Sequence, residues 1–117
     1  IGPDYNVAPT RQVFTVLVDG DVRVLDTSRW GLVPFWAKDL KAGYKMINAR
    51  AETVAEKPAY RTALSRRRCL IVADGFYEWQ AQAQGPKVPM YITLADHQPF
   101  GFAGLWERWT EPESGEA

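Results

Sequence analysis

The feature that most restricts how this sequence can fold is the shortness of its apolar segments, which end at turn-forming pairs. Asp19-Gly20 separates residues 13–18 from residues 22–25, and both segments are rich in β-branched and apolar residues. An Asp-Gly pair between two such segments predicts a β-hairpin, because the turn needs residues that tolerate a positive φ angle. We therefore expect an antiparallel hairpin near the start of the chain.

Further short strands are expected along the rest of the chain, with one helix between them. They are predicted at residues 30–33, 69–72, 76–80, 90–94 and 100–106. The last two are expected to pair with each other across residues 96–99. Residues 45–48 are expected to be extended and residues 51–56 irregular. Residues 58–65 have helical composition, and Pro58 suits a first helical turn. Many short strands with few helices predict an α+β fold of mainly antiparallel strands.

The composition fits one globular domain without an internal repeat or linker. The chain has 117 residues, of which 46% are hydrophobic and 24% charged. It has no apolar stretch near the roughly 20 residues that a membrane span needs, and no signal peptide is recognised at its start. One cysteine excludes an internal disulfide and fits a reducing cytoplasm. The acidic tail at residues 111–117 is predicted to be disordered.

Charge is spread unevenly along the chain. Residues 1–68 hold 12 Lys and Arg against 7 Asp and Glu, a balance of +5, and the remainder carries the matching −5. A basic half can face a polyanion, although solvated surface charge is the commoner explanation. Trp30 and Trp36 bracket residues 31–35 in the basic half, and aromatic residues next to Arg and Lys are typical of single-stranded nucleic acid binding. Their alternative role is in the core.

Cys69 and His97 have the side chains of a nucleophile–base pair. We favour a core cysteine and a turn histidine instead. Cys69 begins a strand expected to be covered on both faces, and His97 lies in a polar turn. One Cys and one His supply too few soft ligands for a metal site, so neither a metal nor a cofactor is expected.

Glu78 lies within a strand rich in aromatic residues. On a strand it shares a face with Phe76, while Tyr77 and Trp79 point to the other face. A carboxyl group that aromatic side chains shield from water is suited to general acid–base catalysis. The alternative is a solvent-facing glutamate on a half-buried strand.

Asn48 and Arg50 form a polar cluster directly after an apolar segment. Projecting from one face, they pair an amide that can orient a reacting group with a guanidinium suited to phosphate. The alternative is an ordinary strand end in which Arg50 and Glu52 form a surface ion pair. Both interpretations stay open on the residues alone.

Taken in order, five segments of the chain resemble the SRAP (SOS response-associated peptidase) family. Residues 5–10, 30–37, 47–53, 68–79 and 102–107 are similar to its YNVAPT, WGL-P-W, NAR-ET, R-C-ADGFYEW and FAGLWE segments. The resemblance spans nearly the whole chain. It implies a barrel-like α+β SRAP fold with a few short helices, of which residues 1–117 form the central part.

The resemblance also implies a function in the DNA-damage response. Members of this family capture abasic sites in single-stranded DNA through a thiazolidine formed by an N-terminal cysteine. It implies that Asn48 orients that cysteine and that Glu78 is the general acid–base in sugar-ring opening and imine chemistry. Arg50 is expected to hold a phosphate beside the lesion. Asn6 and Pro9 are expected to line the DNA cleft, and Trp36 to act as an aromatic wedge.

The family's cysteine stands upstream of Tyr5, and its C-terminal histidine lies beyond this chain. We therefore expect the 117-residue chain alone to be inactive, with Cys69 not the nucleophile and His97 no substitute for the missing histidine. The expected location is the cytoplasm, at the nucleoid when DNA is bound, with no membrane partner. A non-covalent single-stranded DNA-binding module and a cysteine-type (auto)peptidase are the alternatives.

Overall fold

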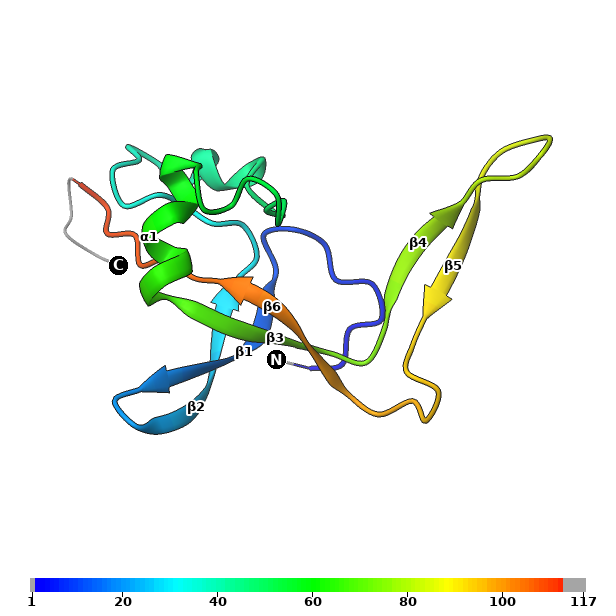
Figure 1. The fold of residues 1–117 in the computed structure, drawn as a ribbon, viewed down its shortest axis with the longest axis horizontal. Helices are drawn as coiled ribbons and strands as arrows, with labels where there is room; N and C mark the ends of the chain where they lie inside the picture. The colour runs from blue at the N-terminus through cyan, green and yellow to red at the C-terminus, as the bar shows by residue number, and fades with distance from the viewer. Residues whose placement is uncertain (1, 113–117) are drawn as a thin grey trace.

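The computed structural model describes residues 2–112. Within that range it has six strands, one α-helix and one 3-10 helix (Figure 1). In chain order these are β1 (Gln12–Asp19), β2 (Val22–Arg29), η1 (Leu40–Tyr44), α1 (Pro58–Arg66), β3 (Arg68–Ala73), β4 (Phe76–Gln80), β5 (Val88–Ile92) and β6 (Phe100–Leu105). The predicted α+β class with antiparallel strands is confirmed. The predicted disordered tail falls largely on residues 113–117, outside the described range.

The first hairpin is confirmed, with its turn one residue later than expected. Asp19 pairs with Val22, so the two turn residues are Gly20 and Asp21. Gly20 has a φ of +63°, whereas the φ of Asp21 is not positive. This sign pattern fits a type II′ turn, which takes Gly at its first central position and matches the right-handed twist of the strands.

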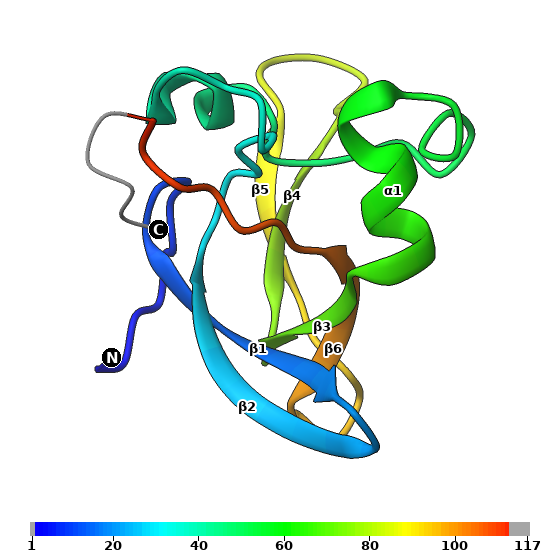
Figure 2. The ribbon, with the colours of Figure 1, turned by 90° about the vertical axis from the view of Figure 1, so that its left-hand side faces the viewer.

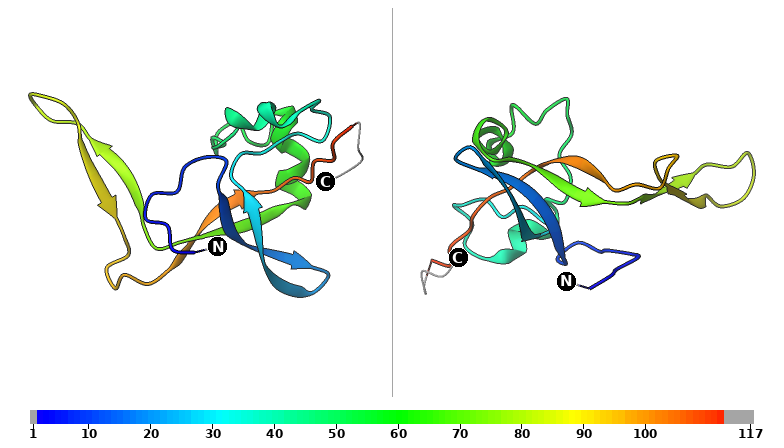
Figure 3. Two further views of the ribbon diagram at one scale, coloured as in Figure 1. Left: turned by 180° about the vertical axis from the view of Figure 1, so that it is seen from behind. Right: turned by 90° about the horizontal axis from the view of Figure 1, so that it is seen from below.

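The strands form two separate sheets and do not close into a barrel, so the barrel-like expectation is wrong for this chain. A four-stranded sheet has the order β2-β1-β3-β6, and β4 and β5 pair only with each other. The β4–β5 hairpin extends away from the larger sheet (Figure 1), and Figure 3 shows the same separation from behind and from below. Among the described strands, β2 and β6 remain edges, which leaves the sheet open.

The expected pairing of the last two strands with each other is wrong. Tyr77 of β4 pairs with Tyr91 of β5, and Ile71 of β3 pairs with Phe102 of β6. The connections on either side of β5, residues 81–87 and 93–99, each have seven residues, so loop length does not decide which neighbour β5 pairs with. The connection at residues 93–99 returns the chain to β3. Phe102 packs on Phe76 there, with ring centroids 5.5 Å apart.

Residues 30–33 form no strand, contrary to prediction, and the chain after them turns into η1. Gly31 has a φ of +128°, a left-handed value that an extended strand does not use. A Cβ atom on Gly31 would lie 2.7 Å from the carbonyl oxygen of Gly43, so the two loops cross in backbone contact. The Leu32 N–H donates to the Met46 carbonyl (2.9 Å). Residues 45–48, expected to be extended, are part of this loop packing.

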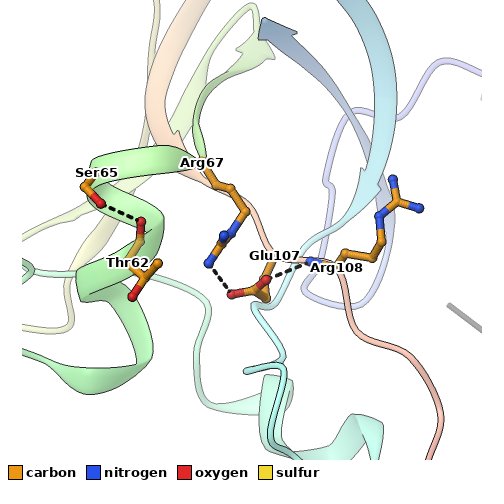
Figure 4. A network of polar contacts seen from close by, with 5 residues as sticks. All are labelled: Thr62, Ser65, Arg67, Glu107 and Arg108. Atoms are coloured by element: carbon orange, nitrogen blue, oxygen red, sulfur yellow. Dashed lines mark hydrogen bonds and ion pairs between the residues drawn. The ribbon is translucent and has the colours of Figure 1, made fainter. Parts of the chain in front are cut away.

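Helix α1 agrees with its prediction, and residues 51–56 form turns as expected. The helix leads directly into β3 through Arg67. The Arg67 guanidinium donates from Nη2 to Oε2 of Glu107 at 2.9 Å, in a pair whose side chains are 21% and 9% exposed (Figure 4). The Trp106 N–H also donates to the Arg67 carbonyl (2.9 Å). These bonds tie the segment after β6 to the α1–β3 junction (Figures 2 and 4).

The core lies where α1 and the loops meet the four-stranded sheet. Its buried apolar residues are Val33, Ala63 and Cys69. Strand β3 is covered on one face only, because Leu70 is 49% exposed, so the expectation of a strand buried on both faces is wrong. In the described residues no helix has the length and apolarity to cross a membrane.

Candidate functional site

The β4–β5 hairpin presents two different faces. Its register confirms that Glu78 shares a face with Phe76, while Tyr77 and Trp79 share the other. The first face carries Phe76, Glu78, Gln80, Val88, Met90 and Ile92, and the second carries Tyr77, Trp79, Pro89 and Tyr91. The hairpin therefore separates a face with one carboxylate among mostly apolar neighbours from a face dominated by aromatic rings.

Glu78 lines an open concavity of about 290 Å³. The other lining residues are Trp79, Gln80, Met90 and Ile92. The Glu78 carboxylate makes no hydrogen bond or ion pair with another side chain in the described part of the chain. An exposed carboxylate above an apolar floor can exchange a proton with a bound ligand.

The opposite face of the hairpin is organised around two stacked tyrosines. The rings of Tyr77 and Tyr91 lie 5.0 Å apart and are tilted by 46°. The Tyr91 hydroxyl donates to Oδ1 of Asp74 (3.2 Å), and a Cβ atom on Gly75 would collide with the Tyr91 ring. Partial desolvation, together with the Asp74 carboxylate, raises the pKa of Tyr91, so its hydroxyl keeps its proton. The absence of a side chain at Gly75 thus leaves room for the Tyr91 ring where the β4–β5 hairpin begins.

The N-terminal segment, residues 4–10, reaches this aromatic face. The Tyr77 hydroxyl donates to the Tyr5 carbonyl at 3.0 Å, across 72 positions of sequence. Next to it, the Asn6 N–H donates to Oδ1 of Asp4 (3.0 Å), and the second oxygen of Asp4 lies 3.6 Å from Arg11 Nη1. Figure 1 shows the segment running between the four-stranded sheet and β4. Asn6 is exposed within this turn, and Pro9 further along is half-buried.

The far end of the same segment is held by Trp30. Thr10 has a φ of +78°, which is an outlier for a β-branched residue, and its N–H donates to the Trp30 carbonyl (2.9 Å). The Trp30 indole Nε1 donates in turn to the Ile47 carbonyl (2.7 Å), directly before Asn48. Trp30 is therefore a partly buried structural residue, and it links the N-terminal segment to the Asn48 loop.

Asn48 and Arg50 both lie on the surface of that loop. The Tyr60 hydroxyl donates to the Asn48 carbonyl (3.4 Å), and burial raises the pKa of Tyr60, which keeps the donor protonated. The Arg50 carbonyl accepts from the Val54 N–H (2.9 Å) and begins the turns that follow. Arg50 and Glu52 form no ion pair within the described residues. Both predicted side chains are thus available to a ligand.

The structure connects Asn48 with Glu78 only indirectly. No hydrogen bond or ion pair among residues 2–112 joins the loop that carries Asn48 to the β4–β5 hairpin, and the concavity beside Glu78 is lined by the hairpin alone. Hydrogen bonds connect Tyr77 to the N-terminal segment, that segment to Trp30, and Trp30 to Ile47. The N-terminal segment is therefore the physical link between the two candidate catalytic residues.

Trp36 differs from Trp30 in being exposed. It is 54% exposed on a turn and packs edge-on against Phe35, with ring centroids 5.0 Å apart. The adjacent Ala37 carbonyl accepts from the indole Nε1 of Trp109 (2.8 Å), which fixes the base of the turn. An aromatic side chain presented in this way can stack on a base.

Cys69 and His97 form no catalytic dyad, as favoured from the sequence. Cys69 is buried, and desolvation raises the pKa of its thiol. It pairs with Gly104, whereas the loop that holds His97 joins the sheet at the Ala73–Phe100 pair. That spacing of four residues along β3 corresponds to roughly 13 Å. In the described part of the chain no cluster of His, Cys, Asp and Glu is suited to a metal ion.

Sequence reasoning missed the tyrosine contacts. The bond from Tyr77 to Tyr5 joins distant positions, and no local pattern marks it. Gly75 is the one available signal, because a glycine directly before an aromatic strand can mark a close approach.

These features define a class of protein: an α+β domain with an open polar site on loops and one hairpin. Two solved structures share the fold. A crystal structure from Bacteroides thetaiotaomicron has a TM-score of 0.74 at 30% identity and covers 92% of this chain and 46% of its own. A phage-related protein from Bordetella bronchiseptica has a TM-score of 0.70 at 33% identity, with 92% and 51% covered.

The family follows from the sequence match. Residues 1–117 match the family described as SOS response associated peptidase (SRAP), and the chain belongs to that family. The abasic site processing protein YoqW of Bacillus subtilis is 53% identical over 111 residues, 95% of this chain and 50% of the relative. The abasic site processing protein HMCES of Xenopus tropicalis is 34% identical over 143 residues, with 97% and 42% covered. The chain spans about half the length of these relatives.

Proposed function

We propose that the protein carrying this chain processes abasic sites in single-stranded DNA by covalent capture. The observation that carries the proposal is the SRAP match over residues 1–117, together with bacterial and vertebrate relatives named as abasic site processing proteins. The exposed carboxylate and the accessible Asn48 and Arg50 side chains support it, because the reaction needs proton transfer beside a phosphate backbone.

The reaction begins with the aldehyde of a ring-opened abasic sugar. The α-amine of an N-terminal cysteine attacks the aldehyde carbon, and loss of one water gives an imine. The thiol sulfur then adds to the imine carbon while its proton passes to the nitrogen. The product is a thiazolidine that joins protein to DNA, with no net oxidation or reduction. The cysteine is inferred from the family resemblance.

Glu78 is the general acid–base in this proposal. As an acid it protonates the ring oxygen during opening of the sugar and the hydroxyl that leaves as water. As a base it accepts the amine proton between these steps. Its place above Met90 and Ile92 gives the sugar an apolar floor while the carboxylate stays accessible.

The remaining predicted residues bind and orient. Asn48 hydrogen-bonds the reacting cysteine, and the Arg50 guanidinium holds the phosphate beside the lesion. Asn6 and Pro9 of the N-terminal segment line the path of the strand. Trp36 stacks on a neighbouring base at the edge of the site.

The test uses the full-length protein and a single-stranded oligonucleotide with one abasic site. We expect an adduct that survives denaturing electrophoresis and is absent when borohydride has reduced the abasic aldehyde to an alcohol. Asn48→Ala should slow adduct formation by roughly tenfold or more, since orientation of the nucleophile is lost. Glu56→Gln, which changes an exposed carboxylate on the turns that follow Arg50 and has no role in the proposed reaction, is the matched control. Absence of an adduct with the aldehyde substrate contradicts the proposal.

A non-covalent single-strand binder is the second candidate, favoured by the exposure of aromatic side chains. Tyr5 is 83%, Trp79 63% and Trp36 54% exposed. Such a protein would bind intact and abasic strands equally, with affinity that falls steeply as salt rises, and would give no adduct.

A further inference from the structure

The N-terminal segment is tied to the β4–β5 hairpin at one point. Among the hydrogen bonds of residues 2–112, the bond from the Tyr77 hydroxyl to the Tyr5 carbonyl (3.0 Å) is the one that joins this segment to the hairpin. Because it ends on a backbone carbonyl, the bond fixes the course of the chain and leaves the Tyr5 ring 83% exposed.

Tyr77 and Glu78 are neighbours on β4 and point to opposite faces. Successive residues on a strand advance by roughly 3.3 Å, so any movement of β4 carries both side chains together. The tie at Tyr77 therefore sets the position of Tyr5 and Asn6 relative to the carboxylate. A hydrogen bond to another residue of the hairpin would place Tyr5 and Asn6 at a different position along β4.

The donor itself is held in place. The Tyr77 ring packs on the Tyr91 ring, and Gly75 leaves the space that the Tyr91 ring occupies. A stacked aromatic side chain loses little further entropy when its hydroxyl makes a bond. Tyr77 is thus preorganised to receive the segment.

The acceptor segment is also shaped in advance. Asp4 closes a turn with the Asn6 N–H and lies beside Arg11, and Thr10 is held in the left-handed region by its bond to Trp30. A strained backbone of this kind persists only where its surroundings fix it. The segment therefore behaves as a strap whose two ends are attached to different parts of the molecule.

We propose that Tyr77 is a positioning residue that ties the N-terminal segment to β4 and so fixes where residues 5–9 run relative to the strand that carries Glu78. The inference rests on the proposed function for its catalytic consequence. The tie itself is independent of DNA, and the two can be tested separately.

The first measurement is hydrogen exchange in the full-length protein. Tyr77→Phe removes the hydroxyl and keeps the stacked ring, and we expect exchange at residues 5–9 to rise by roughly three- to tenfold, as for loss of one hydrogen bond. Tyr91→Phe is the matched control, because it removes the neighbouring hydroxyl on the same face and leaves the Tyr5 bond intact. It should leave exchange at residues 5–9 within about twofold of wild type.

The second measurement separates binding from reaction. We expect Tyr77→Phe to lower the adduct rate constant at saturating abasic DNA by roughly tenfold. The Kd for the borohydride-reduced strand should change by less than about threefold, since most of the phosphate contacts remain. A residue that acts only through stability would not produce this split.

The outcomes distinguish the two proposals. If wild type gives no adduct, the proposed function fails, while the exchange data still decide whether the tie exists. Unchanged exchange at residues 5–9 in Tyr77→Phe overturns the tie. Faster exchange with an unchanged rate constant overturns the positioning role, and so does an equal loss of rate in Tyr91→Phe.

Discussion

The four-stranded sheet and the β4–β5 hairpin are built from similar strands but held in different ways. Strand β3 of the sheet has hydrogen-bonded partners on both sides and buries Cys69. The hairpin has a single pairing, and its residues Tyr77, Trp79 and Tyr91 are at least half exposed. An isolated two-stranded hairpin is marginally stable in water. The comparison indicates that the sheet supplies stability, whereas the hairpin presents the Glu78 carboxylate and exposed aromatic rings.

The largest expected effect is on the rate of adduct formation, with little change in the stability of the sheet. Glu78→Gln should lower the rate of adduct formation by roughly 100-fold or more, because it removes the proposed general acid–base. The melting temperature should shift by less than about 2 °C, since the side chain is exposed and unpaired in the described structure. Gel-based single-turnover kinetics and a thermal melt measure the two quantities. A similar loss of rate in the Glu56→Gln control would remove the contrast.

The second prediction concerns the stability of the larger part of the fold, away from the hairpin. Glu107→Ala removes the partner of Arg67 in a pair that is 9% and 21% exposed, and it should lower the free energy of unfolding by about 2 kcal/mol. Urea denaturation followed by tryptophan fluorescence measures the change. Glu56→Ala, at an exposed position, should cost less than about 0.5 kcal/mol. Equal effects of the two substitutions would show that the ion pair adds no stability.

A third experiment uses the reactivity of the Cys69 thiol to measure how readily the sheet opens. Because the Cys69 thiol is buried and its pKa is raised, thiol labelling near neutral pH should be at least about tenfold slower in the native protein than in urea. An absorbance assay with an aromatic disulfide reagent follows the reaction. Rapid labelling of the native protein would mean that the sheet opens far more readily than its packing indicates.

The smallest effect concerns the hairpin at alkaline pH. In the folded protein the pKa of Tyr91 is raised above its ordinary value of 10.0. The protonated hydroxyl therefore contributes its full share of stability at any pH below 10.0. The contribution is lost as the pH rises through the folded pKa, because the unfolded state releases the proton first. Wild type should therefore lose slightly more stability than Tyr91→Phe above about pH 10. Parallel urea titrations across this range test the difference, and identical pH profiles would contradict it.

Local features of the fold could be predicted from the sequence, whereas the pairing of strands and loops that are far apart in the sequence could not. The hairpin at Gly20, the strand that carries Glu78 and the helix beginning at Pro58 all follow from residue type and spacing. The pairing of β6 with β3 depends on contacts between residues far apart in sequence, so turn signals alone assigned it wrongly. The irregular path at Gly31 depends on an equally distant backbone contact with Gly43.

The candidate site shows the same division. Cys69 could be set aside because a free cysteine on an apolar strand is usually buried, and the structure agrees. The predicted roles of Asn48, Arg50 and Glu78 come from the family resemblance and remain predictions. The bond between Tyr77 and Tyr5 could not have been read from the sequence, because neither residue carries a local mark of the other.

The crossing of Gly31 over Gly43 has a consequence for how this molecule tolerates change. With a Cβ atom at either position the neighbouring backbone or the Val33 side chain would be 2.9 Å away or less. Even one added methyl group would force the two loops apart, and the stretch leading to Asn48 would move with them. If the proposed DNA capture is correct, an alanine at either glycine should impair it without contacting the nucleic acid, and a compensating mutation would have to make room on the facing loop.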